Sequence, residues 1–124
     1  MAQQNIIKEK SFLFAIEIIH LANELRNNDK EFILSKQLYK SGTSIGACVR
    51  EAEFAESNLD FIHKFSIALK EANETIYWLE LVANVFPSKS EKVTGLIKEN
   101  AAIKNILTAI IKSCKSKKKT ISKT

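Results

Sequence analysis

Residues 61–87 read FIHKFSIALKEANETIYWLELVANVFP, and this stretch decides the fold class. Its apolar residues recur every three or four positions, the spacing that places side chains on one face of an α-helix. Phe86-Pro87 ends the pattern because proline disfavours a helical conformation in the residue before it. Ser57 or Asn58, just upstream, is suited to cap a helix N-terminus. We therefore predict a helix over residues 58–86 with a core face of Phe61, Phe65, Ala68, Ala72, Ile76, Leu79 and Ala83.

The sequence on either side has the same periodicity and predicts three further helices, over about residues 8–27, 30–56 and 89–114. Short connections between long helices force neighbouring helices to lie antiparallel. The sequence thus predicts an all-α fold, an up-down-up-down four-helix bundle over residues 1–114. The expected core faces are Phe12, Ala15, Ile16, Ile19 and Ala22 in the first helix, Leu34, Leu38, Ser41, Ile45, Val49 and Ala52 in the second, and Val93, Leu96, Ile97, Ile103, Leu107, Ile110 and Cys114 in the fourth.

The composition agrees with a single helical domain. The chain has 124 residues, of which 45% are hydrophobic and 27% charged, as in globular proteins. Three Gly and one Pro are too few for the many tight turns of an all-β fold. The first ten residues contain no long apolar run, and Cys48 and Cys114 form no Cys-x-x-Cys pair. We therefore expect a cytoplasmic protein with buried free thiols and no membrane partner.

Two of the predicted helices have more apolar surface than a lone bundle would bury. A helix that is apolar nearly all round is covered on more than one side, and here a second subunit would supply the further cover. We therefore expect a homo-oligomer, with the alternative that the first helix is central in a monomer. The expected interface residues are Phe14, Ile18, Leu21 and Leu25 in the first helix and Ile67, Trp78, Leu81 and Val85 in the third.

The net charge of +5 is concentrated at the C-terminus. Residues 1–111 carry 13 Lys and Arg against 14 Asp and Glu, whereas residues 112–124 carry six Lys and no acid. With almost no apolar residues, residues 115–124 are predicted to form a flexible basic tail. Such a tail binds phosphate backbones without reading sequence, or else only keeps the protein soluble. The six lysines are Lys112, near the end of the bundle, and Lys115, Lys117, Lys118, Lys119 and Lys123 in the tail.

The pattern of titratable residues gives no sign of an enzyme. Glu17-x-x-His20 and Asp60-x-x-His63 have the spacing of di-iron ligands, but both pairs fall outside the predicted core faces. Residues 41–46 contain two glycines but lack the lysine and spacing of a phosphate-binding loop. We therefore predict no catalytic residue, no metal or other cofactor, and no small-molecule substrate.

The central part of the chain resembles the 23S rRNA-intervening-sequence proteins, also called four helix bundle proteins. The resemblance implies a bacterial protein, a left-handed up-down bundle and a homo-oligomeric ring, expected to be a pentamer. The family usually has Asn where this chain has Cys48, and often Arg where it has Lys40, so a polar site built on that Asn is not reproduced here. The matching segments are Gln37–Ala47 (QLYKSGTSIGA), Glu51-Ala52, Asp60-Phe61-Ile62, Ala68–Ala72 (ALKEA) and Glu74–Leu79 (ETIYWL).

Similar to this family is the accessory protein of diversity-generating retroelements, whose basic ring surface binds nucleic acid and a reverse transcriptase. This similarity implies RNA or DNA as a partner of a non-enzymatic bundle that makes phosphate contacts. The tail would supply most of these contacts, with Lys36, Lys40 and Arg50 as contributors on the bundle. These three cations could instead pair with Glu71 and Glu74 of a neighbouring subunit. The alternative function is an assembly or adaptor protein that recruits a protein partner such as a reverse transcriptase, with a solubilising tail.

Overall fold

The protein is almost entirely helical. The computed structural model describes the backbone of residues 2–123 and the side chains of residues 4–116. It contains the helices α1 (Ala2–Asn28), α2 (Ile33–Ala52), α3 (Asn58–Val85) and α4 (Ser90–Lys123), with one 3-10 turn, η1 (Pro87–Lys89), before α4. No strand occurs among residues 2–123. The predicted all-α fold class is therefore confirmed.

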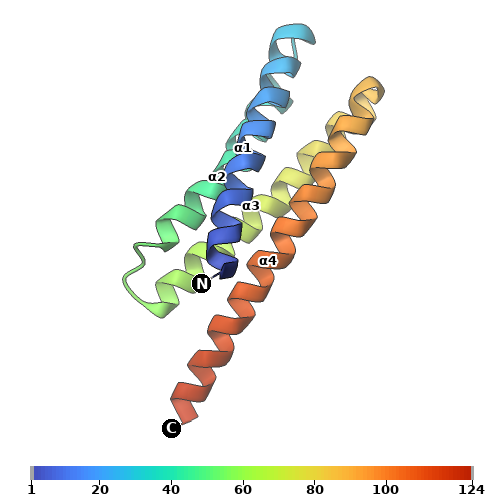
Figure 1. The fold of residues 1–124 in the computed structure, drawn as a ribbon. Helices are drawn as coiled ribbons and strands as arrows, with labels where there is room; N and C mark the ends of the chain where they lie inside the picture. The colour runs from blue at the N-terminus through green and yellow to red at the C-terminus, as the bar shows by residue number, and fades with distance from the viewer. Residues whose placement is uncertain (1, 124) are drawn as a thin grey trace.

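The four helices form an antiparallel bundle (Figure 1). α1 packs against α2 and α4, and α3 packs against the same two helices. α1 and α3 are therefore diagonal to each other, so their outer faces point away from the bundle on opposite sides. In the part of the chain that the structure describes, no helix is long and apolar enough to cross a membrane.

Local chemistry explains where α2 and α3 begin. Lys30 has a φ of 57°, a left-handed conformation in which α1 cannot continue. Glu31 then caps α2, because its Oε1 accepts hydrogen bonds from the backbone N–H groups of Ile33 and Leu34, both at 2.7 Å. At the start of α3, Ser57 Oγ accepts from the Asp60 N–H at 3.0 Å. This bond confirms Ser57 as the predicted N-cap.

The predicted boundaries differ from the observed ones at three places. α1 begins at Ala2 rather than near residue 8, and α2 covers Ile33–Ala52 rather than the predicted 30–56. α4 reaches Lys123, whereas the sequence predicted a helix end at 114 and a flexible tail beyond it. The side chains of Lys117, Lys118, Lys119 and Lys123 lie outside the described residues.

The core faces of α2, α3 and α4 largely match the prediction. Leu38, Ile45, Phe65, Leu79 and Leu107 are at most 2% exposed and belong to one continuous apolar core. The buried face of α3 is rotated slightly from the predicted one: Thr75 and Val82 are buried, rather than Ile76 and Ala83. A small polar layer crosses this core, where the Thr75 hydroxyl donates to Ser41 Oγ at 3.0 Å.

The burial of the two apolar stripes of α1 differs from the prediction at most positions. Phe14, Ile18, Leu21 and Leu25, predicted as interface residues, are at most 1% exposed and lie in the core of the single chain. In the stripe predicted to be core, Phe12 and Ile16 are exposed, Ala15 and Ile19 are half-buried, and Ala22 is buried as predicted. Periodicity does not distinguish two apolar stripes on one helix; here the contact with α2 selects one, because Ile18 packs against the space left by Gly42.

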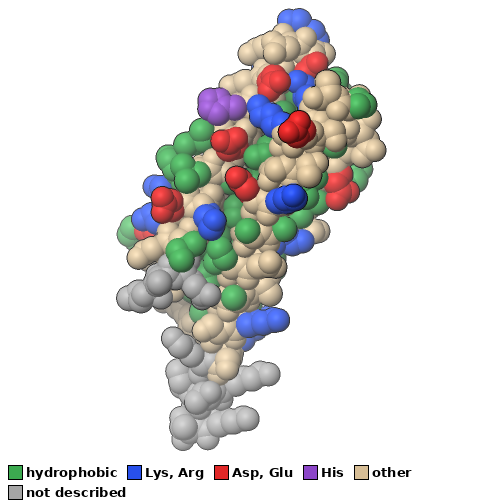
Figure 2. Space-filling view, turned by 45° about the vertical axis from the view of Figure 1, so that its right-hand side comes forward, with side chains coloured by type: hydrophobic (Ala, Val, Ile, Leu, Met, Phe, Trp, Pro, Cys, Tyr) green, Lys and Arg blue, Asp and Glu red, His purple; other side chains and the backbone are tan. Residues whose placement is uncertain are grey.

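The exposed stripe of α1, with Leu13 beside it, forms the α1 outer patch, which we define as Phe12, Leu13 and Ile16. Their exposed fractions are 51%, 53% and 38%. Figure 2 shows one face of the molecule, on which apolar and charged side chains are interspersed. On α3, Val85 is exposed, whereas Ile67, Trp78 and Leu81 are half-buried and Trp78 packs against the core.

Candidate nucleic-acid interface

The outer face of α2 is basic. α2 carries Lys36, Lys40 and Arg50, and no acidic residue occurs between Ile33 and Arg50. Its one carboxylate, Glu51, is paired with Lys64 of α3 at 3.4 Å. Positive charge on this face is therefore not cancelled within the helix, which is the condition for attracting phosphate groups.

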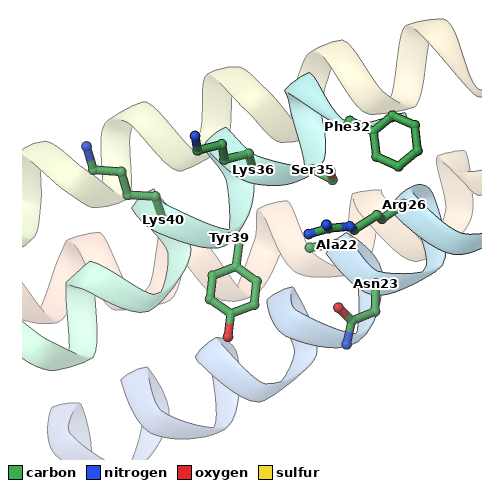
Figure 3. A pocket seen from close by; sticks show the side chains of 8 residues that line it. All are labelled: Ala22, Asn23, Arg26, Phe32, Ser35, Lys36, Tyr39 and Lys40. Carbon is green, nitrogen blue, oxygen red and sulfur yellow. The ribbon is translucent and has the colours of Figure 1, made fainter. Parts of the chain in front are cut away.

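A groove runs along the seam between α1 and α2 (Figure 3). Its cavity volume is about 690 Å³. No Asp or Glu is among its lining residues, whereas three of them carry a positive charge. We call this site the basic groove; it is lined by Ala22, Asn23 and Arg26 of α1, by Phe32 in the connection, and by Ser35, Lys36, Tyr39 and Lys40 of α2.

The side chains of the basic groove point in two directions (Figure 3). Tyr39 reaches from α2 across the seam toward α1, and the Arg26 guanidinium extends from α1 back toward α2. Arg26 also lies over the Phe32 ring, 6.0 Å from its centroid. Lys36 and Lys40 also line the groove, and their side chains extend from α2 in a different direction from that of Tyr39. The groove therefore has two parts. One is a hollow between the Tyr39 ring and the Arg26 guanidinium, and the other is the pair of ammonium groups of Lys36 and Lys40.

Among the described residues, Lys36 and Lys40 form no ion pair. Lys40 interacts electrostatically with Glu71 of α3. Burial and the neighbouring Glu74 raise the pKa of the Glu71 carboxyl. The positive charges of Lys40 and Lys70 act against this rise. Both groove lysines are exposed and free to contact an anion in solution.

Arg50 is not part of the basic groove. Its guanidinium lies over the ring of Phe12, 5.3 Å from the centroid, farther along the α1–α2 seam. Lys112 and Lys115 are exposed on α4, near the C-terminus and at the opposite end of the bundle from the groove (Figure 1). The structure thus brings together Lys36 and Lys40 from the predicted set, and places Arg50, Lys112 and Lys115 elsewhere.

Sequence reasoning missed Arg26, Phe32 and Tyr39. One signal was available: Lys36, Tyr39 and Lys40 are spaced i, i+3 and i+4, so a helix places an aromatic ring beside two cations. Arg26 and Phe32 gave no such signal, because they reach the groove from α1 and from the connection through tertiary packing.

In the portion described, no three His, Cys, Asp or Glu side chains cluster as metal ligands. Burial, together with the nearby Glu51 and Glu71, raises the pKa of the Cys48 thiol. A raised pKa leaves less of the nucleophilic thiolate at neutral pH.

Comparison with known proteins places the chain in a family. A search of curated proteins finds no match. A similar solved structure is that of a protein of unknown function from the S23 ribosomal protein family of Bacteroides thetaiotaomicron, with 48% sequence identity and a TM-score of 0.86. The match covers 89% of this chain and 98% of that one. The sequence profile of the 23S rRNA-intervening sequence protein matches residues 3–109, and the chain therefore belongs to the family of 23S rRNA-intervening sequence proteins.

Proposed function

We propose that the protein is a non-enzymatic, homo-oligomeric four-helix bundle that binds RNA or DNA through phosphate contacts. The observation that carries the proposal is the outer face of α2, where Lys36 and Lys40 are exposed beside a groove lined by no carboxylate. Lysines in such a setting neutralise phosphates and release counterions, which favours binding without sequence readout.

The C-terminal lysines supply a second phosphate-binding surface. Lys112 and Lys115 lie at the far end of α4, and four further lysines follow them in the sequence. In a ring of five copies each basic surface is repeated, and simultaneous contacts by several weak sites strengthen overall binding.

The oligomer uses two outer faces. The α1 outer patch and the outer face of α3 (Ile67, Trp78, Leu81 and Val85) lie on diagonal helices. A contact between two different faces of successive copies generates a ring when the rotation closes. This arrangement leaves the outer face of α2 free, so assembly and nucleic-acid binding do not compete.

The test is a titration of labelled structured RNA and of duplex DNA with the full chain at several salt concentrations. We expect affinity to fall with salt along a log–log slope of about −0.7 to −0.9 per phosphate contact. Lys36→Gln/Lys40→Gln should weaken binding and make the slope shallower by about two contacts. Replacing all six C-terminal lysines with Gln should remove further contacts.

The matched control is Lys70→Gln/Lys98→Gln, which removes the same charge from exposed positions outside the basic groove. If this variant weakens binding as much as the groove variant, net charge alone acts and the site assignment is wrong. If the wild-type chain binds neither nucleic acid at low salt, the proposal fails. The exposed α1 outer patch would then favour an adaptor that recruits a protein partner.

A further inference from the structure

We propose that the basic groove holds one unpaired nucleotide of a single strand, with its base between Arg26 and Tyr39 and its flanking phosphates on Lys36 and Lys40. The inference rests on the proposed nucleic-acid binding and narrows it from any phosphate backbone to strands with unpaired bases. It is carried by the side chains that α1 and α2 bring together at their seam.

The hollow offers surfaces on which a base stacks. Tyr39 is 45% exposed although its ring extends across the seam, so one side of it is open to a ligand. Aromatic rings and guanidinium planes are the two side-chain surfaces on which unpaired bases stack. The volume of about 690 Å³ lies within the range of roughly 300–1,000 Å³ found for small-ligand sites.

Polar groups in the hollow suit the edge of a base. Asn23 lines the groove with an amide, which both donates and accepts hydrogen bonds. Ser35 adds a hydroxyl at the nearly buried floor, where it is 4% exposed and makes no side-chain hydrogen bond within the described part of the chain. These groups would be unnecessary for a site that contacts only phosphates.

The two lysines favour a strand over a free nucleotide. They are one helical turn apart, about 6 Å along the axis of α2, and they line the groove beside the hollow. A strand supplies a phosphate on each side of the inserted base, whereas a free mononucleotide supplies one phosphate group. A duplex has phosphates but keeps its bases paired and stacked, so it could contact only the lysines.

The test compares a labelled single strand of polyadenylate with an RNA duplex of equal length, using the full chain. Tyr39→Leu removes the ring and keeps an apolar side chain. We expect it to lower affinity for the single strand by about five-fold to a hundred-fold, the range measured for a stacked base. Affinity for the duplex should not change. Tyr39→Phe, which keeps the ring, should retain single-strand binding.

Tyr77→Leu is the matched control, because Tyr77 is the only other tyrosine and is 56% exposed on α3. All variants are first compared with the wild type by circular dichroism and oligomeric mass. An equal loss for both ligands, or no loss for either, would overturn the single-strand inference while leaving phosphate binding intact. Absence of wild-type binding to both would instead overturn the proposed function.

Adenosine monophosphate tests whether the groove binds a free nucleotide instead of a nucleotide within a strand. At concentrations well above the dissociation constant of the strand, it should not displace the strand. If it binds as tightly as the strand and Tyr39→Leu abolishes that binding, the occupant is a free nucleotide and the assignment to a strand is wrong.

Discussion

Gly42 lies in α2 where the helix packs closely against Ile18 of α1. A Cβ added there would lie 2.6 Å from Cγ2 of Ile18, a β-branched side chain that is 0% exposed and has no room to move. We therefore expect Gly42→Ala to lower the free energy of unfolding by about 1–3 kcal/mol, as in other overpacked cores. Urea denaturation followed by circular dichroism measures the change.

Gly95 provides the control for this prediction. It lies in α4, is exposed, and has no atom within 4 Å of an added Cβ. Gly95→Ala should therefore raise the free energy of unfolding by up to about 1 kcal/mol, the difference in helix propensity. A Gly42→Ala variant as stable as Gly95→Ala would show that the close approach to Ile18 is not tight.

At the scale of elements, an ion cluster ties the end of α1 to the start of α4. Glu24 accepts hydrogen bonds from Lys89 at 2.9 Å and Lys92 at 3.0 Å, and Lys89 also pairs with Asp29 at 3.2 Å. The bonds from Lys89 and Lys92 hold the pKa of Glu24 below the ordinary carboxyl range. The hydrogen bond between Lys89 and Glu24 also raises the pKa of the Lys89 ammonium group.

The lowered pKa of Glu24 predicts a pH dependence of stability. A carboxyl whose pKa is depressed on folding stabilises the fold above its unfolded pKa, about 4.3, and loses that contribution as pH falls through the folded pKa. At pH 7, Glu24→Gln should therefore lower the free energy of unfolding by up to about 1 kcal/mol. The difference from wild type should shrink as the solution is acidified below the ordinary pKa.

Denaturant unfolding at a series of pH values measures this difference, and Glu9→Gln, at an exposed position in α1, is the control. A difference for Glu24→Gln that stays constant into the acid range would contradict the assigned cluster.

At the scale of the whole molecule, the α1 outer patch is one of the two proposed contacts between subunits. Leu13 and Ile16 are 53% and 38% exposed in the single chain, so Leu13→Glu/Ile16→Glu should leave the bundle folded. Carboxylates placed in an apolar subunit contact are costly to desolvate. We therefore expect this variant to shift the assembled protein toward monomer in light scattering coupled to size-exclusion chromatography.

Phe54→Glu/Leu59→Glu is the control for assembly, since these residues are 85% and 60% exposed around the α2–α3 connection and it adds the same charge. Unchanged mass for Leu13→Glu/Ile16→Glu would refute a contact through α1. A wild-type chain that is monomeric would refute the oligomer altogether.

Part of the candidate site could be predicted from one helix alone. Lys36 and Lys40 were chosen from sequence, and their spacing already placed them on one face of α2. The hollow beside them needed two helices, since Arg26 comes from α1 and Tyr39 from α2. No periodicity within a single segment encodes which side chains meet across a seam.

The sequence by itself determined the number of helices, their antiparallel order and the core faces of α2, α3 and α4, because each of these follows from local periodicity and from residues that start or stop a helix. Only the tertiary structure decided which apolar stripe of α1 is buried, because α1 carries two stripes that periodicity does not rank. The packing of Ile18 against Gly42 settles the choice by shape. The same contact between α1 and α2 places the α1 outer patch at the surface and forms the basic groove.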